Sequence, residues 1–164
     1  MLVLGVDPGS RVTGYGFVRS EGGRLSCVEC GSISSPGSVP FYRRIHTIFE
    51  SMVSLMSRFR PDQMVIEDLF YARNVKSSLK LGHARGAVLI AAVQCGVEIF
   101  EYSPLEIKQA VTGYGRADKE QVRAMVRTIL GMKSLDNLDT SDALAAAICH
   151  ANSRASTLRT RSVK

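Results

Sequence analysis

The sequence has no hydrophobic run long enough to cross a membrane. Its longest apolar stretch, residues 86–95, is about half of the roughly 20 residues that a membrane-spanning helix requires. The first residues, MLVLGVD, also lack the basic region and the cleavage site of a secretory signal peptide. We therefore expect a cytoplasmic protein with no membrane partner.

The chain also offers little of the chemistry that thiol or imidazole groups provide. Among its four cysteines, Cys27 and Cys30 form one C-x-x-C pair, but neither a second pair nor a nearby histidine completes a zinc site. We expect reduced, unligated thiols. The three histidines, His46, His83 and His150, fall in expected helices and are assigned packing or surface roles. A covalent nucleophile is not expected, because no Ser-His-Asp or Cys-His arrangement has local support.

Acidic residues are missing from the C-terminal tail. Residues 153–164 contain four basic side chains and no acidic one, so the net charge of +6 comes mainly from this segment. The length of 164 residues suits one compact domain with a sizeable core. We expect residues 1–152 to form that domain, and residues 153–164 to be a disordered arm that adds non-specific affinity for DNA.

Acidic residues are also missing from residues 69–86, directly after Glu67. The basic side chains of this segment are Arg73, Lys76, Lys80 and Arg85. A basic stripe beside an acidic site would hold phosphate groups next to the chemistry. We therefore predict that these four side chains bind DNA.

Hydrophobic periodicity predicts three strands followed by alternating helices and strands. The expected strands are residues 1–7, 12–20, 25–34, 64–69 and 98–102. The expected helices are residues 41–59, 77–94, 104–111, 119–130 and 139–153. This order indicates an α/β fold with a mixed five-stranded sheet flanked by helices, in which the first three strands are antiparallel and the later strands are parallel.

Four carboxylates in three distant segments are the most informative residues. Asp7 and Glu67 follow apolar strand-like runs, and Asp139 and Asp142 have the i,i+3 spacing of one helix face. Taken singly, Asp7 could form a turn, Glu67 could be a strand-end charge, and the last pair could cap a helix. Taken together they predict a metal site, because converging carboxylates repel one another unless divalent cations lie between them.

The type of ligand predicts the ion and the reaction. Mg²⁺ suits an all-oxygen site, as does Mn²⁺. Two such ions about 3.5–4 Å apart can bind the attacking and the leaving oxygen of a phosphodiester. Hydrolysis of a phosphate ester is therefore the expected reaction, with two ions in the active site.

The helix expected from Ser77 to Gln94 is apolar around most of its second half. Such a helix needs a second apolar surface beyond the sheet on which it lies. Gly82 and Gly86 lower its helix propensity, a cost that is understandable where another backbone approaches closely. Two interpretations stay open: the C-terminal helix of the same chain covers it, or it forms a homodimer interface.

Four segments resemble the RuvC family of Holliday-junction resolvases. They are GVDPGSRVTGYG, VIEDLFYARNVKSSLKLGHARG, FEYSPLEIKQAVTGYGRADKEQV and DTSDALAAAICH. The resemblance spans about residues 1–152 and implies a ribonuclease H-like fold. It also implies a homodimer that uses Mg²⁺ or Mn²⁺ to make paired symmetric nicks in four-way DNA junctions during homologous recombination and DNA repair. A branch-migration complex of the RuvA and RuvB type is the implied protein partner.

The resemblance also implies roles for individual residues. The four acidic positions, Asp7, Glu67, Asp139 and Asp142, would be the metal ligands. Lys108 and Lys119 match basic positions near the phosphate backbone, and Lys119 could offset charge in the transition state. Phe70 matches an aromatic residue near the crossover, where it would stack on a distorted base.

Three other functions fit parts of the sequence. A ribonuclease H-like RNA-processing nuclease would use the same acidic site. The run from Asp7 to Gly14 resembles the phosphate-binding hairpin of actin-like ATPases, but those proteins close two domains over ATP and this chain has length for one. A non-catalytic junction binder is disfavoured, because phosphate binding gains nothing from four carboxylates.

Overall fold

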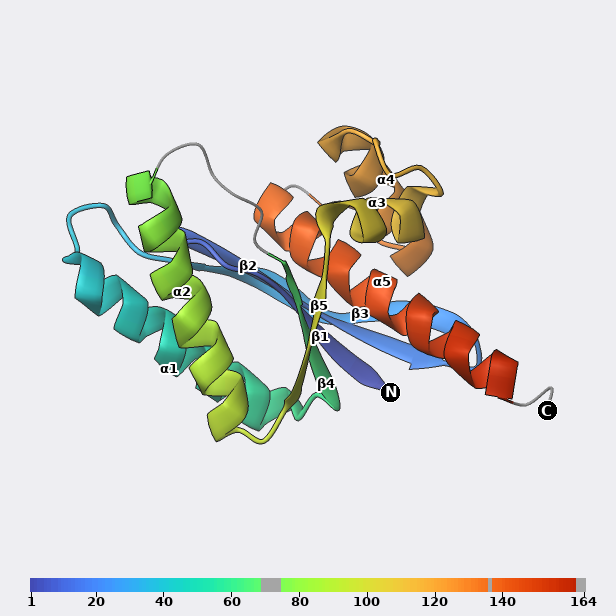
Figure 1. Ribbon diagram of the computed structural model, residues 1–164, viewed down its shortest axis with the longest axis horizontal. Coiled ribbons are helices and arrows are strands. Elements are labelled where there is room, and N and C mark those ends of the chain that lie inside the picture. The colour runs from blue at the N-terminus through green and yellow to red at the C-terminus, as the bar shows by residue number, and fades with distance from the viewer. Residues whose placement is uncertain (69–74, 136, 162–164) are drawn as a thin grey trace.

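The chain folds into a five-stranded mixed sheet with helices on both faces (Figure 1). The computed structural model describes residues 1–68, 75–135 and 137–161, with side chains through Arg154. The strands are β1 (Leu2–Asp7), β2 (Val12–Glu21), β3 (Arg24–Ser34), β4 (Gln63–Glu67) and β5 (Glu98–Tyr102). The helices are α1 (Phe41–Phe59), α2 (Val75–Gln94), α3 (Pro104–Thr112), α4 (Lys119–Leu130) and α5 (Leu138–Arg161).

The sheet has the mixed topology that the sequence predicts. Its strand order is β3-β2-β1-β4-β5. The first three strands pair antiparallel, and β1, β4 and β5 pair parallel. Gly22 and Gly23 adopt positive φ angles in the tight turn between β2 and β3, a conformation that glycine adopts at no steric cost.

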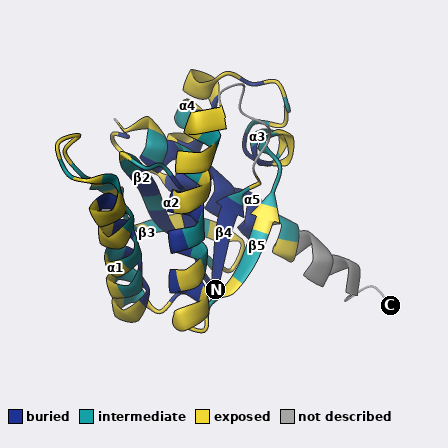
Figure 2. Cartoon of the chain, turned by 60° about the vertical axis from the view of Figure 1, so that its left-hand side comes forward, coloured by how far each residue is buried: buried dark blue, intermediate teal, exposed yellow. Residues whose placement is uncertain are grey.

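Two hydrophobic cores lie on opposite faces of the sheet because successive strand residues point to opposite sides. Leu4, Val6 and Phe17 pack with α1 and α2, whereas Val3 and Val18 pack with α3, α4 and α5. Figure 1 shows the two helix layers on either side of the strands, and Figure 2 shows the buried residues between them. The C-terminal helix therefore does not cover α2, and that interpretation of the apolar helix is wrong.

Helix α5 lies unusually close to the sheet because it crosses strand positions that have no side chain. Gly5 and Gly16 face each other across β1 and β2. A methyl group at Gly5 would overlap the backbone of Ala143, and one at Gly14 would overlap the backbone of Asp139. These contacts fix the height of α5 above β1 and β2.

Four helix boundaries differ from the sequence-based expectation, and the smallest difference is the end of α3 at Thr112 rather than at Val111. Helix α2 begins at Val75 rather than at Ser77 or Ser78. Helix α5 begins at Leu138 and continues past the expected end at Ser153 to Arg161. Neither proline nor glycine occurs after Gly131, so the sequence contains no helix breaker at Ser153. Within the described part of the chain, every helix is too short or too polar to span a membrane.

Candidate active site

The candidate site lies where the central parallel strands end. Asp7 is the last residue of β1, and Glu67 is the last residue of β4, which pairs parallel with β1. The carboxyl ends of adjacent parallel strands meet at the same edge of a sheet, and this edge is where α/β folds bind ligands. Each carboxylate is therefore positioned by a buried strand rather than by a loop.

The first turn of α5 brings the other two carboxylates to this edge. Asn137 caps the helix, since its side-chain oxygen accepts hydrogen bonds from the backbone N–H groups of Asp139 (2.9 Å) and Thr140 (3.3 Å). The Thr140 hydroxyl donates to the carbonyl of Gly31 in β3 (3.0 Å). Asp139 is thus not the N-cap that one interpretation of the sequence proposed, and its carboxylate is available for other contacts.

Asp7 lies within electrostatic range of the other three carboxylates. Burial, together with the nearby carboxylates of Asp142, Glu67 and Asp139, raises the pKa of Asp7 to about 7. Burial and Asp142 also raise the pKa of Glu67. The structure therefore brings together the acidic residues that the sequence singles out, from two strands and one helix.

Two lysines, Lys119 and Lys108, accompany the acidic cluster. The Nζ of Lys119 lies 2.9 Å from the Asp142 carboxylate, and this contact raises the pKa of Lys119. Lys119 is the first residue of α4, which begins with a reciprocal capping box between Asp118 and Gln121. Lys108, in α3, is close enough to oppose the rise in the pKa of Glu67.

The cluster has the donor set for divalent metal, although its carboxylates are not close together. Across residues 1–68, 75–135 and 137–154, whose side chains are described, no three carboxylate, imidazole or thiol groups form a ready-made metal site. The ammonium of Lys119 partly offsets the negative charge, yet the raised pKa of Asp7 shows that repulsion and burial still dominate there. The four carboxylates fit hard cations, which would relieve this repulsion.

We predict that the metal-free protein loses stability as the pH rises from about 4 to about 7. Folded Asp7 has a pKa of about 7, against an ordinary pKa of 3.8 for an exposed aspartate, so the folded state binds more protons than the unfolded state in this range. The full shift corresponds to a loss of up to about 4 kcal/mol. Thermal melts in EDTA across this range measure the loss. A metal-free Asp7→Asn variant with the same pH dependence as the wild type would contradict the assignment to Asp7.

The predicted DNA-binding residues of the basic stripe do not share one environment. Lys80 is exposed on α2, and Lys76 is exposed near the start of that helix. Arg85 is only 8% exposed, so little of its side chain is accessible to DNA in this structure. Its guanidinium is directed into the protein by the helical spacing that leaves Lys80 outside. Phe70 and Arg73 lie outside the described residues.

Other polar groups serve the fold rather than the site. His150 is fully buried, with its Nδ1 2.9 Å from the Tyr102 hydroxyl and its Nε2 2.7 Å from Oε1 of Gln63. Burial lowers the pKa of His150 to about 4, so it is neutral at physiological pH. This agrees with the packing role expected from the sequence. His46, by contrast, is exposed beside Glu50 on α1.

The sheet order and the position of the acidic cluster define a nuclease of the ribonuclease H-like fold. Within that class, the chain belongs to the RuvC family. The family model, crossover junction endodeoxyribonuclease RuvC, matches residues 3–150. The chain is 48% identical over 153 residues to the RuvC endonuclease of Geobacter metallireducens, and the match covers 93% of both chains.

Solved structures agree with this family. The chain superimposes on Thermus thermophilus RuvC with a TM-score of 0.86 at 36% identity, covering 96% of this chain and 98% of that one. Against T. thermophilus RuvC in complex with a Holliday junction substrate, the TM-score is 0.90 at 36% identity, with 96% and 97% of the two chains covered. The protein is thus a crossover junction endodeoxyribonuclease, and the RNA-processing alternative is set aside.

Proposed function

We propose that this nuclease resolves four-way DNA junctions by metal-assisted hydrolysis at the acidic cluster, with one active site in each subunit of a homodimer. The main observation is the convergence of Asp7, Glu67, Asp139 and Asp142 at the ends of β1 and β4, where burial and the neighbouring carboxylates raise the pKa of Asp7. The T. thermophilus relative solved with a Holliday junction supports the same substrate for this chain. The reaction would take place on cytoplasmic DNA.

The four carboxylates would hold two Mg²⁺ ions, or Mn²⁺ in their place, because all their donor atoms are oxygen. Bound ions would supply an activated water and offset the charge of the leaving oxygen. Asp7 and Glu67 give the site a rigid base, since each ends a strand of the parallel sheet. Lys119 starts the reaction cycle paired with Asp142 and is placed to exchange that contact for a phosphate oxygen.

DNA would approach the site along the helices that surround it. Lys76 and Lys80 on α2 and Lys108 on α3 are proposed to contact the phosphate backbone. Phe70 and Arg73 follow Glu67 in sequence and are proposed to act at the crossover. The basic segment 153–164 would add salt-dependent, non-specific affinity. Cooperation with a branch-migration complex of the RuvA and RuvB type stays a prediction from the family.

The direct test compares three substrates with and without divalent metal. A mobile four-way DNA junction, a matched duplex and an RNA hairpin are incubated with the protein in Mg²⁺, in Mn²⁺ and in EDTA. We expect paired symmetric nicks in the junction, in either metal and not in EDTA. Cleavage that persists in EDTA would refute the metal site, and equal cleavage of the RNA hairpin would refute junction selectivity.

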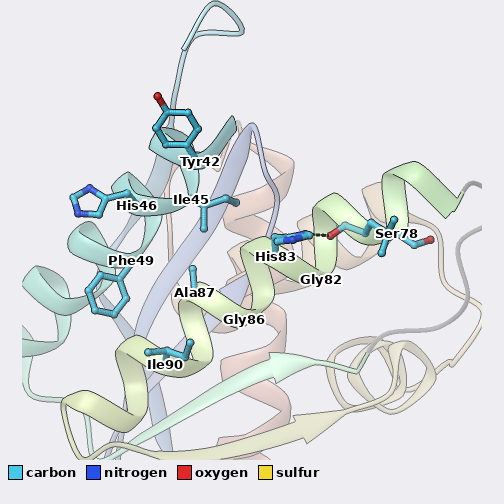
Figure 3. Close-up of a pocket in the computed structure, with 11 residues that line it drawn as sticks. Tyr42, Ile45, His46, Phe49, Ser78, Gly82, His83, Gly86, Ala87 and Ile90 are labelled. Atoms are coloured by element: carbon cyan, nitrogen blue, oxygen red, sulfur yellow. Dashed lines mark hydrogen bonds between the residues drawn. The ribbon is translucent and has the colours of Figure 1, made fainter. Parts of the chain in front are cut away.

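An apolar groove between α1 and α2 is the proposed homodimer interface. The groove encloses about 710 Å³, and its wall includes Phe49 of α1 and Ile90 of α2 (Figure 3). Ile90 is 63% exposed, an unusual level for an isoleucine. Around Gly82 and Gly86, the described atoms leave open space where a Cβ would stand. A second copy of this helix can therefore approach closely, as two active sites related by a two-fold axis require.

We predict that Ile90→Asp produces a monomer and lowers paired-nick cleavage about 10- to 100-fold, because a buried charge in the interface costs several kcal/mol. Sedimentation and cleavage of a cruciform plasmid measure the two effects. Met125→Asp, on α4 of the opposite layer, is the control because Met125 is also an exposed apolar residue. A monomeric Ile90→Asp variant with full paired-nick activity would show that paired nicking does not require the dimer.

A further inference from the structure

Arg85 connects helix α2 to the strand end that presents Glu67. Its side chain is only 9% exposed, and its Nη1 donates a hydrogen bond to the backbone carbonyl of Glu67. Its Nη2 lies 2.9 Å from the carboxylate of Glu101 in β5. One guanidinium on α2 therefore contacts the ends of both neighbouring strands, β4 and β5.

The Glu67 carbonyl needs such a donor because of the sequence of β1. The parallel ladder between β1 and β4 ends at the pair Val6 and Ile66. The next hydrogen bond of this ladder would run from the backbone N–H of residue 8 to the carbonyl of Glu67. Residue 8 is proline, which has no backbone N–H. A backbone carbonyl left unpaired at this depth would be costly. Arg85 supplies the donor that Pro8 lacks.

We propose that Arg85 is a positioning residue for metal binding, which acts by fixing the backbone of Glu67. The inference rests on the proposed metal site. A guanidinium suits this role because its planar fork can donate to a carbonyl and a carboxylate at once and stays charged at every physiological pH. Its positive charge also opposes part of the rise that burial and Asp142 cause in the pKa of Glu67. Partners of this kind behind metal ligands commonly change metal affinity or activity by about 10- to 100-fold.

The test separates positioning from DNA binding. For the wild type, Arg85→Gln and Arg85→Lys, we would measure the Mg²⁺ and Mn²⁺ concentrations that give half-maximal junction cleavage. Junction affinity is measured separately in Ca²⁺, and thermal melting reports folding. Lys80→Gln is the matched control, because it removes the same charge from an exposed position of the same helix.

We expect Arg85→Gln to raise the half-maximal metal concentration about tenfold or more while junction affinity changes less than about twofold. Arg85→Lys should recover part of the metal response, since an ammonium can donate to the Glu67 carbonyl but cannot span both partners. Lys80→Gln should do the reverse, weakening junction affinity and its salt dependence while leaving the metal response unchanged.

Glu101→Gln keeps the inference testable if Arg85→Gln fails to fold. This variant removes the ion pair with β5 but leaves the donor to Glu67 in place, so we expect a smaller change in the metal response than for Arg85→Lys. Weaker junction binding with an unchanged metal response in Arg85→Gln, or in both Arg85→Lys and Glu101→Gln, would overturn the inference. Wild-type cleavage that needs no metal would refute the proposed metal site and the inference with it, whereas failure in the variants alone refutes only the role of Arg85.

Discussion

Asp7→Asn is expected to abolish junction cleavage while junction binding is retained. Asp7 occupies the centre of the acidic cluster, where the other three carboxylates all act on it. Asparagine keeps the shape of the side chain but removes a negative donor from the proposed metal site. Losing several kcal/mol of charge stabilisation in the transition state lowers the rate roughly 10³-fold. Single-turnover cleavage of a labelled junction in Mg²⁺ measures this loss.

Binding and stability distinguish this loss from misfolding. Removal of one carboxylate reduces repulsion with phosphate groups, so junction affinity in EDTA should stay the same or increase. The metal-free variant should also melt above the wild type at pH 8, because the wild type must keep a buried, repelled carboxylate ionised. Glu21→Gln, at the end of β2, changes the same charge far from the site and serves as the control. Retained cleavage in Asp7→Asn would remove Asp7 from the metal ligands.

The fold and the acidic residues could be predicted because their signals are local. Apolar runs that end in Asp7 and Glu67 mark buried strands, and i,i+3 spacing places Asp139 and Asp142 on one helix face. The antiparallel start and the later parallel strands follow from the order of short turns and long helical crossovers. These features depend on neighbouring residues along the chain, and the sequence displays them directly.

The orientation of individual side chains depended on contacts that the sequence does not display. Arg85 belongs to a basic run, yet helical rotation points it inward beneath Glu67 while Lys80 stays exposed. Because Pro8 has no backbone N–H, the carbonyl of Glu67 lacks a donor from β1, and Arg85 supplies one. This missing donor can be recognised only once the register between β1 and β4 is known. The capping role of Asn137 was similarly hidden, because the neighbouring aspartates are equally good capping residues.

The glycines of β1 and β2 could have predicted from the sequence that a helix packs closely against these strands. Gly5, Gly14 and Gly16 fall on the strand face that receives α5, and Gly5 lies opposite Gly16. Alternate glycines in a strand otherwise weaken it, so their presence indicates a close backbone approach. In this protein the approaching backbone is the first half of α5, which bears Asp139 and Asp142. The spacing between helix and sheet therefore sets the distance between the two halves of the active site.

Gly14→Ala is expected to lower cleavage about 10²-fold, because a displacement of roughly 1 Å at a catalytic group has an effect of this size. The added methyl group would overlap the carbonyl of Asp139 and approach the backbone nitrogen of Thr140 to 2.9 Å. Both obstacles are backbone, so no side-chain rotation can relieve them, and the start of α5 must move away from Asp7. Overpacking of this kind also costs about 1–3 kcal/mol of stability.

The measurement compares cleavage and metal response at a temperature where the variant is folded. Gly37→Ala is the matched control, since a methyl group there would meet no described atom within 4 Å. Because Gly14→Ala leaves every carboxylate in place, additional Mg²⁺ or Mn²⁺ should restore part of its activity, whereas Asp7→Asn should respond much less. A Gly14→Ala variant that melts and cleaves like the wild type would show that α5 can shift without moving its carboxylates from the site. The close packing of α5 on β2 would then be a requirement of the fold alone.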